Sequence, residues 1–280
     1  ECPNASINIF LTSINYSFIT SAKINILIAD YETLGDFNIE YLSSMDYILC
    51  KSEYSRDIIE TGLRNNNIKL NNIYTLGWKS PCIETTIEKS FNDVFLFCNN
   101  KQNNHYNTLI YEWKESYPTL NIVGYSRRYR ETQSNIIYHD NIKTDDFHNL
   151  FNKCAFHIIL EENGSFEHLI NQVKQVKSIP IAMYAFSNKE VMDKDNSFLL
   201  DFKKRKSNTM LYGARFIPNI KSIHNRISEI KNLSEETLLN ICANGFNDYK
   251  NKTLLFETRF NKLFNDIFKQ VRTTKKVKLL

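Results

Sequence analysis

The segment that most constrains the fold is residues 158–191, where two short apolar runs flank a helical pattern. Residues 158–160 and 179–183 are β-branched and apolar, as buried strands are, and apolar residues recur at helical spacing within 167–177. The pattern predicts a strand–helix–strand unit. In a parallel sheet, the loop before the helix lies at the carboxyl edge, where unpaired backbone N–H groups can receive an anion. Residues 161–165 form that loop.

Similar patterns along the rest of the chain predict two α/β lobes followed by helices. The expected strands of the first lobe are 24–29, 47–49 and 72–76, with a helix at 55–63. Those of the second lobe are 93–98, 120–123 and 135–138, with helices at 108–115 and 144–152, the latter N-capped by Thr144. Helices are expected at 222–231, at 234–245 with Ser234 as N-cap, and at 254–271. We therefore expect lobes at 1–89 and 90–215 and a helical segment at 216–280.

The composition fits a globular protein and excludes several classes. With 280 residues, 42% of them hydrophobic, the chain can bury one large core or two smaller ones. The net charge is +4, with basic runs at 203–206 and 272–278. These runs favour an anionic ligand or a membrane surface, or are simply solvated. Phosphate-loop, dinucleotide, zinc-protease and serine-hydrolase motifs are missing, and no nucleic-acid-binding module is evident.

The six cysteines are scattered without a metal-ligand spacing, so we expect reduced core residues and a cytoplasmic location. No apolar run approaches the roughly 18 residues that span a bilayer. The many Asn, Ile and Lys residues suggest an A+T-rich genome.

Several residues after the 158–160 strand match a known pattern. Phe166, His168, Ile170 and Asn171 fall on or near the sequence Glu-Gly-Phe-Gly-His-Tyr-Ile-Asn-Glu-Ala. This stretch resembles the carboxyl-terminal domain of retaining GT-B glycosyltransferases, in particular a branch common in large DNA viruses and fungi. The segments IADYETL, MDYILCKSEYSRDII, YTLGWKS and residues 95–124 resemble further parts of that family, in the same order.

The resemblance implies an α/β, GT-B-like fold, with two Rossmann-like lobes, a cleft between them, and a last helix that packs back on the first lobe. The implied activity is the transfer of a sugar from a nucleotide-sugar donor to a glycan or protein acceptor, with retention of configuration. It implies no metal and no cofactor beyond the donor, and the host cytoplasm as the location if the source is viral. The short first lobe is also compatible with one domain of a longer polypeptide.

One departure from the family concerns its two donor-binding Glu residues. Aligning His168 and Asn171 places Gly164 and Gln172 at those positions. Gln172 can hydrogen-bond a hydroxyl but carries no charge. Glu162 or Glu190, both near strand ends, could supply a catalytic carboxylate instead. The alternative is a non-catalytic GT-B-like domain that binds a glycan or a protein partner.

Positive charge near the donor diphosphate would stabilise the leaving group. The resemblance places Lys101 at the family's Gly-Lys loop, Asn100 at its Gly, and His105 near a second Lys. Arg127 and Arg128 follow another strand end and suit phosphate, because guanidinium binds it bidentately. The alternative for the two arginines is a solvated basic loop.

The remaining candidates follow strand ends of both lobes. His168 could hold a sugar hydroxyl, or serve only as a helix-terminal hydrogen bonder. The donor-site set also includes Gly164, Ser165, Phe166, Asn171, Gln172 and Asn188, the last in a loop with Glu190 that could equally be polar without a ligand. Glu32 and Lys51 would face the acceptor, or form a surface ion pair.

Overall fold

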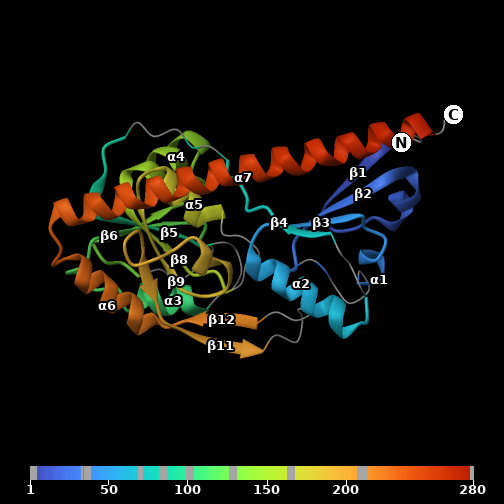
Figure 1. The fold of residues 1–280 in the computed structure, drawn as a ribbon. Helices are drawn as coiled ribbons and strands as arrows, with labels where there is room; N and C mark the ends of the chain where they lie inside the picture. The colour runs from blue at the N-terminus through green and yellow to red at the C-terminus, as the bar shows by residue number, and fades with distance from the viewer. Residues whose placement is uncertain are drawn as a thin grey trace.

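The computed structural model describes residues 5–32, 34, 39–68, 72–81, 83, 87–98, 104–125, 131–162, 168–206 and 214–277. Two α/β lobes lie side by side, and one long helix, α7 (Glu235–Val277), runs along both (Figure 1). Both lobes contain parallel sheets, which the strand–helix–strand patterns of the sequence predict.

The first lobe contains a four-stranded parallel sheet in the order β1-β2-β3-β4. Its elements are β1 (Ala5–Thr12), the 3-10 helix η1 (Tyr16–Ser21), β2 (Ala22–Ala29), α1 (Ile39–Leu42), β3 (Tyr47–Cys50), α2 (Glu53–Asn65) and β4 (Ile73–Thr75). Three of these strands were predicted, and β1 is an addition. Strand alternation gives the sheet two apolar faces, so both must be covered.

The second lobe contains a six-stranded parallel sheet in the order β10-β9-β8-β5-β6-β7. Its elements are β5 (Ser90–Phe97), α3 (Asn104–Tyr111), β6 (Thr119–Val123), β7 (Ile136–His139), α4 (Thr144–Lys153), β8 (Cys154–Ile159), α5 (His168–Gln175), β9 (Ile179–Met183), the 3-10 helix η3 (Phe186–Glu190) and β10 (Phe198–Leu200). The strand–helix–strand unit predicted first is β8-α5-β9.

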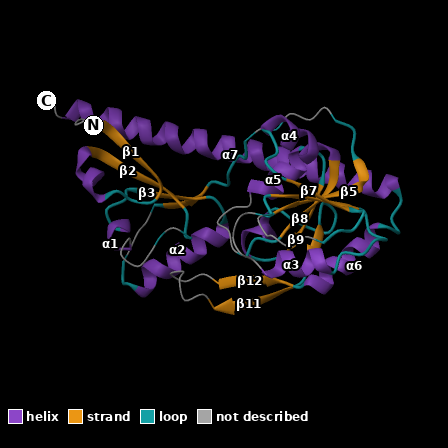
Figure 2. Cartoon of the chain, turned by 180° about the vertical axis from the view of Figure 1, so that it is seen from behind, coloured by secondary structure: helices purple, strands orange, loops and turns teal. Residues whose placement is uncertain are grey.

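Helices cover both faces of the second sheet (Figure 2). On one face, Leu96 and Ile158 pack in a cluster with α3 and α6 (Ile220–Ile230). On the other face, Phe95 and Ile159 pack in a cluster with α4 and α5. Adjacent residues of one strand thus enter different cores, as the period of two requires. This two-sided burial explains why the strands read as continuous apolar runs.

An antiparallel hairpin, β11 (Phe202–Lys206) and β12 (Ala214–Pro218), follows the second sheet. The sequence prediction treated residues 203–206 only as a basic run. Four consecutive basic residues show no alternation of apolar and polar side chains, so the sequence gives no strand signal there. The Tyr54 side chain of α2 interacts with the backbone of Ala214, so the hairpin reaches the first lobe.

The long helix α7 corrects the prediction of separate helices at 234–245 and 254–271, because it continues without a break through Gly245. A Cβ atom on this glycine would lie 3.3 Å from Cγ of Lys174 and 3.5 Å from the backbone oxygen of Asn196. The glycine therefore permits α7 to pass close to α5, which a sequence pattern alone does not show. Ser234 caps the helix as predicted, since its Oγ accepts the N–H of Thr237 at 3.2 Å.

The carboxyl-terminal half of α7 lies on the first lobe (Figure 1). Phe264 and Ile267 share a buried cluster with Ile26, Ile28 and Leu49 of β2 and β3. The opposite face of the same sheet packs against α2. Each large apolar side chain buried here contributes roughly 1.5–3 kcal/mol. The last helix therefore supplies one of the two covering layers of the first lobe.

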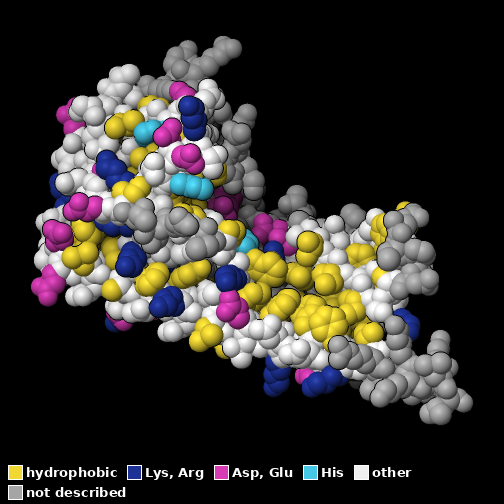
Figure 3. All heavy atoms as spheres, turned by 90° about the horizontal axis from the view of Figure 1, so that it is seen from above, with side chains coloured by type: hydrophobic (Ala, Val, Ile, Leu, Met, Phe, Trp, Pro, Cys, Tyr) yellow, Lys and Arg dark blue, Asp and Glu magenta, His cyan; other side chains and the backbone are white. Residues whose placement is uncertain are grey.

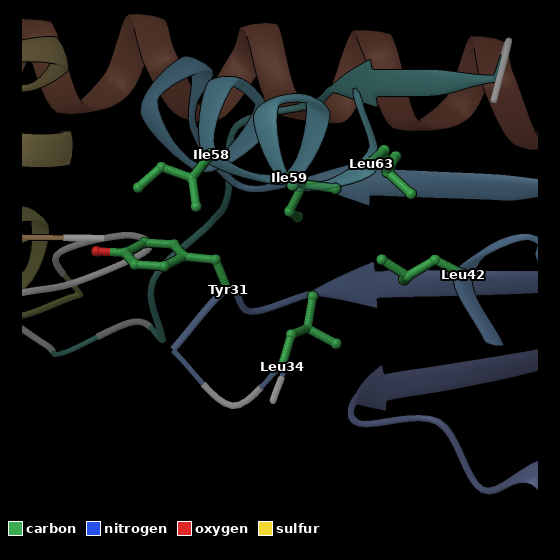
Figure 4. Close-up of a pocket in the computed structure, with 7 residues that line it drawn as sticks. Tyr31, Leu34, Leu42, Ile58, Ile59 and Leu63 are labelled. Carbon is green, nitrogen blue, oxygen red and sulfur yellow. The ribbon is translucent and has the colours of Figure 1, made fainter. Parts of the chain in front are cut away.

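The core of the first lobe contains a small cavity of about 10 Å³ (Figure 4). Its lining is almost wholly apolar and comes from the segment after β2, from α1 and from α2: Tyr31, Leu34, Leu42, Ile58, Ile59, Gly62 and Leu63. A space of this size holds one water molecule at most, and an apolar wall keeps it dry. It is a packing defect rather than a ligand site.

Two local predictions were wrong. Helix α3 begins at Asn104 and ends at Tyr111, four residues before the predicted bounds at each end, because the following Trp113 and Tyr117 pack in the core as a turn. Thr144 is the first residue of α4 rather than its cap; Lys143 occupies the cap without a side-chain hydrogen bond.

The prediction of reduced core cysteines is confirmed for those that the structure describes: Cys50, Cys98, Cys154 and Cys242 are buried and free.

Candidate functional site

The candidate site lies where the carboxyl ends of both sheets meet at the junction between the lobes. Asp30 directly follows β2, Lys51 follows β3, and Ser80 lies in the segment after β4. From the second lobe come His168, the first residue of α5, and Glu190, the last residue of η3. Strand carboxyl ends are the usual ligand-binding edge of parallel α/β sheets.

Lys51 is the cation at the centre of this junction. Its Nζ lies 3.7 Å from a carboxylate oxygen of Asp30, and its side chain is 12% exposed. The same Nζ lies 5.5 Å from the centre of the Trp78 ring, within cation–π range. The carboxylate and the indole hold the ammonium in place, while a small part of the Lys51 side chain remains exposed. A fixed, partly desolvated cation of this kind suits an anionic ligand.

His168 contacts the first lobe through Ser80. Its Nδ1 lies 3.4 Å from Oγ of Ser80, and that hydroxyl also lies 3.3 Å from the backbone oxygen of His168. Burial and the positive charge of Lys51 lower the pKa of His168. The imidazole is therefore neutral near pH 7, with the capacity both to donate and to accept a hydrogen bond.

Glu190 makes the clearest connection between the lobes. Its two carboxylate oxygens accept the backbone N–H groups of Glu53 at 2.9 Å and Tyr54 at 2.8 Å, at the start of α2. Oγ of Ser52 accepts the N–H of Ser55 in the same turn. The first N–H groups of a helix have no acceptor within the helix, and Glu190 of the second lobe accepts two of those of α2. Burial raises the pKa of its carboxyl group.

Glu162 and His105 lie together on the second lobe. A carboxylate oxygen of Glu162 lies 3.7 Å from Nε2 of His105, near the start of α3. The backbone oxygen of Glu162 accepts the N–H of Phe216 at 2.8 Å, which ties β12 to the end of β8. The predicted donor-binding histidine and catalytic carboxylate are thus neighbours.

The polar residues predicted near α5 and β9 differ in burial. Asn171 is 3% exposed and Asn188 is 2% exposed, whereas Gln172 is half-buried. Nδ2 of Asn188 donates to the backbone oxygen of Met183 at 3.0 Å, and its Oδ1 has no hydrogen-bond partner. A buried oxygen without a partner costs free energy, so Oδ1 of Asn188 is an unused hydrogen-bond acceptor within η3.

The other predicted residues are placed as follows. Glu32 is half-buried, and its backbone N–H donates to Oδ1 of Asp30 at 3.2 Å. The predictions for Asn100, Lys101, Arg127, Arg128, Gly164, Ser165 and Phe166 lie outside the described residues.

The sequence prediction missed Asp30, Trp78 and Ser80. Asp30 directly follows a predicted strand, so its position was a usable signal. Trp78 and Ser80 lie in the YTLGWKS segment that resembles the family, but their contacts with Lys51 and His168 depend on the fold and could not be read from the sequence.

Other features do not compete with this site. Across the described ranges, no group of three or more His, Cys, Asp or Glu side chains is placed to hold a metal ion, and no helix has the length and apolarity to cross a membrane. A hollow of about 830 Å³ lies along β7 and α4, but none of the predicted site residues lines it.

Comparison with solved structures identifies the fold. The GtfA/B complex aligns with a TM-score of 0.68 at 13% identity, covering 96% of this chain and 58% of that one. The pneumococcal O-GlcNAc transferase GtfA, in complex with UDP and GlcNAc, aligns at 0.65 and 10% identity, covering 95% and 57%. A sucrose-phosphate synthase from Thermosynechococcus elongatus aligns at 0.61 and 9% identity, covering 89% and 69%.

The chain has a GT-B-like fold. The predicted fold class is therefore confirmed, and the solved neighbours are GT-B glycosyltransferases. The chain spans just over half the length of the first two of them. No family model and no curated protein sequence matches the chain.

Proposed function

We propose that the protein is a retaining, metal-independent glycosyltransferase that uses a nucleotide-sugar donor and a glycan or protein acceptor. The observation that carries the proposal is the junction between the lobes, where Lys51, neutral His168 and the start of α5 meet at strand carboxyl ends. The GT-B-like fold supports it, because the neighbouring structures include an O-GlcNAc transferase with UDP bound.

The proposed chemistry requires charge stabilisation and orientation. The nucleoside diphosphate leaves with negative charge, so fixed cations near its oxygens stabilise the transition state without a metal ion. We assign the diphosphate to the start of the second lobe, with Lys101 as its main cation. His168 would hold a sugar hydroxyl, and Lys51 with Glu32 would face the acceptor.

The activity test combines donor binding with product analysis. Purified protein is incubated with uridine, guanosine and adenosine diphosphate sugars and a panel of glycan and peptide acceptors, with and without a chelator, and both the released nucleotide and the glycosylated product are analysed. We expect release with one donor class, unaffected by the chelator, and an α-anomeric product from an α-linked donor. No release with any donor would overturn the enzymatic proposal.

The variant Lys101→Ala tests the donor assignment separately. Loss of one charge-assisted contact should weaken donor binding by about 1–3 kcal/mol, measured by calorimetry. Lys262→Ala, at an exposed lysine of α7 outside both basic runs, is the matched control and should bind as the parent does. Equal affinity of all three proteins would remove Lys101 from the site.

One observation favours a second function, a non-catalytic GT-B-like domain that binds a glycan or protein. Gly164 and Gln172 replace two family carboxylates, and Glu190 is engaged by α2 rather than directed at a sugar. The paired variant Gly164→Glu with Gln172→Glu distinguishes the functions. Activity in the parent that Glu162→Gln lowers by an order of magnitude supports the enzyme; activity in the paired variant alone supports the binding domain.

The proposed setting is a reducing cytoplasm, the host's if the source is a large DNA virus. Four buried, free cysteines support a reducing compartment. The excess of Asn, Ile and Lys supports an A+T-rich source.

A further inference from the structure

The hairpin of β11 and β12 concentrates positive charge. Residues 202–218 contain five basic residues and no acidic one, whereas the net charge of the whole chain is +4, so the remainder of the chain carries −1. On the face that carries α7, by contrast, lysine and arginine side chains lie scattered among acidic ones (Figure 3). Lys203 and Lys204 are exposed, and neither forms an ion pair with a carboxylate in the described part of the chain. The hairpin is therefore a local source of positive potential.

The register of the hairpin sorts its residues onto two faces. Residues directly opposite each other in an antiparallel ladder share a face, and the face that includes Ala214 and Phe216 packs in the core of the second lobe. The positions on the other face are two opposed pairs: Lys203 with Ile217, and Arg205 with Arg215. Neighbouring positions on such a face lie roughly 5 Å apart across the strands and roughly 7 Å apart along them. Three of the four positions turned away from the core are thus basic and close together.

The pair of Arg205 and Arg215 is unfavourable in the free protein. Like charges directly opposite each other destabilise a ladder. An acidic group bound across the two positions would remove this repulsion, because guanidinium binds phosphate and carboxylate bidentately. The opposed arginines therefore point to an acidic ligand rather than to a role in folding.

The base of the hairpin lies beside the candidate site. The backbone N–H of Phe216 donates to the backbone oxygen of Glu162 at 2.8 Å, at the end of β8, and the Tyr54 side chain of α2 interacts with the backbone of Ala214. Arg215 stands between these two contacts, one with each lobe. The hairpin extends from the second lobe toward α2 of the first (Figures 1 and 2). A polymer bound to it would lie at the junction where we place sugar transfer.

We propose that this face of the hairpin binds a glycan that carries acidic groups, and that this polyanionic glycan is the acceptor of the transferred sugar. The acceptor role rests on the proposed function, whereas the binding does not. Three cations and one isoleucine suit a polymer with repeated acidic groups. Among the described positions of this face there is no aromatic ring on which a nucleic-acid base could stack, and the apolar face is turned into the core rather than toward a membrane.

Binding is measured by fluorescence anisotropy with three labelled probes: a heparin hexasaccharide, with sulfate and carboxylate groups, an oligogalacturonate, with carboxylates alone, and uncharged maltohexaose. We expect an acidic probe to bind, more weakly as salt is added, and maltohexaose not to bind. Lys203→Gln with Arg205→Gln should weaken binding ten-fold or more. Lys23→Gln with Lys262→Gln removes the same charge from exposed lysines of β2 and α7 and should bind as the parent does.

The variant Arg215→Gln separates ligand binding from folding. It removes one of two opposed charges, so the melting temperature of the free protein should be equal or higher, while the acidic probe binds about ten-fold more weakly. A variant that melts lower and binds equally well would show that the arginines serve the fold, and overturns the proposal. So does a parent that binds no acidic oligosaccharide, or one that binds single-stranded DNA, polyglutamate or anionic vesicles more tightly.

Transfer assays separate the acceptor role from the proposed function. With a donor that releases nucleotide, the variant Lys203→Gln with Arg205→Gln should lower kcat/KM for the acidic oligosaccharide ten-fold or more and leave donor hydrolysis unchanged. Glycosylation of maltohexaose alone, equal in the parent and this variant, overturns the acceptor role. Absence of nucleotide release with every donor overturns the proposed function, whereas an acidic glycan that binds the parent and not this variant still supports the binding site.

Discussion

The buried histidine of β8 should make the protein sensitive to acid. His157 is 1% exposed and packs between aromatic rings: its ring centre lies 4.4 Å from that of Phe151 and 5.0 Å from that of Phe95. Its Nε2 lies 3.1 Å from the backbone oxygen of Cys154. Burial, with the nearby charge of Lys89, lowers the pKa of His157 from 6.5 to about 3.

The sign of the pH dependence of stability follows from the number of protons that the folded and unfolded chains bind. Between about pH 6.5 and pH 3, the unfolded chain binds a proton at His157 that the folded chain does not. Stability is therefore lost as the pH falls through this range, by about 1.4 kcal/mol per unit. At pH 4.5 the loss from this residue is roughly 3 kcal/mol, a large share of a typical folding free energy.

The assay is urea unfolding at several pH values between 4.5 and 7 for the parent and two variants. His157→Phe keeps an aromatic ring but removes the titrating group, so its free energy of unfolding should fall less steeply with acid, by about one proton. His148→Gln, at an exposed histidine, should retain the parent's slope. Identical slopes for the parent and His157→Phe would refute the reasoning.

Three further predictions concern packing and backbone. Phe264→Ala should destabilise the protein by about 3–5 kcal/mol in urea unfolding, because it removes a ring buried between α7 and the first lobe; a change below 1 kcal/mol, of the order seen on exposed surfaces, would show that α7 is dispensable there. Gly124→Ala should lower the free energy of unfolding more than Gly77→Ala does. Both glycines have a positive φ, +78° and +81°, so both substitutions strain the backbone. A Cβ on Gly124 would in addition lie 2.6 Å from the backbone oxygen of Cys98, whereas the nearest atom to a Cβ on Gly77 would lie 3.9 Å away. Asp248→Asn should cost about 3–5 kcal/mol, because it leaves the fully buried Lys174 ammonium without its carboxylate partner at 3.0 Å, and equal melting temperatures would contradict this.

Local patterns predicted most of the parallel core. The apolar run at 179–183 predicted β9, and the 3.6-residue period predicted α5, whereas the run at 158–160 marked only the end of β8, which begins at Cys154. The same patterns failed where a distant contact decides the outcome. Gly245 lies inside α7 where a Cβ atom would come within 3.3 Å of Cγ of Lys174 and 3.5 Å of the backbone oxygen of Asn196, and this neighbourhood is not encoded within the helix itself.

The position of the candidate site was predictable from the sequence, but the contacts between its residues were not. Lys51 and Glu190 were candidates because they follow predicted strands, and parallel sheets place the residues after their strands at one edge. Their partners could not be read from the sequence: Glu190 accepts N–H groups 136 and 137 positions earlier in the chain. A contact at this separation depends on how the two lobes pack, which periodicity does not report.

Two roles of the Glu190 carboxylate, joining the lobes and orienting a donor sugar, predict different effects of substitution. To orient a donor sugar, Glu190 would have to share its carboxylate between the sugar and the N–H groups of Glu53 and Tyr54, which couples donor binding to the contact between lobes. Glu190→Gln removes the charge but keeps one acceptor oxygen. If Glu190 only joins the lobes, the variant should lose about 1.5–3 kcal/mol of stability and keep its turnover once folded. If it also orients the sugar, turnover should fall ten-fold or more at saturating donor, about 1.4 kcal/mol of transition-state stabilisation, in protein whose melting curve shows it folded. Because the first result changes the melt and the second changes kcat, measuring both on the same preparation assigns the residue.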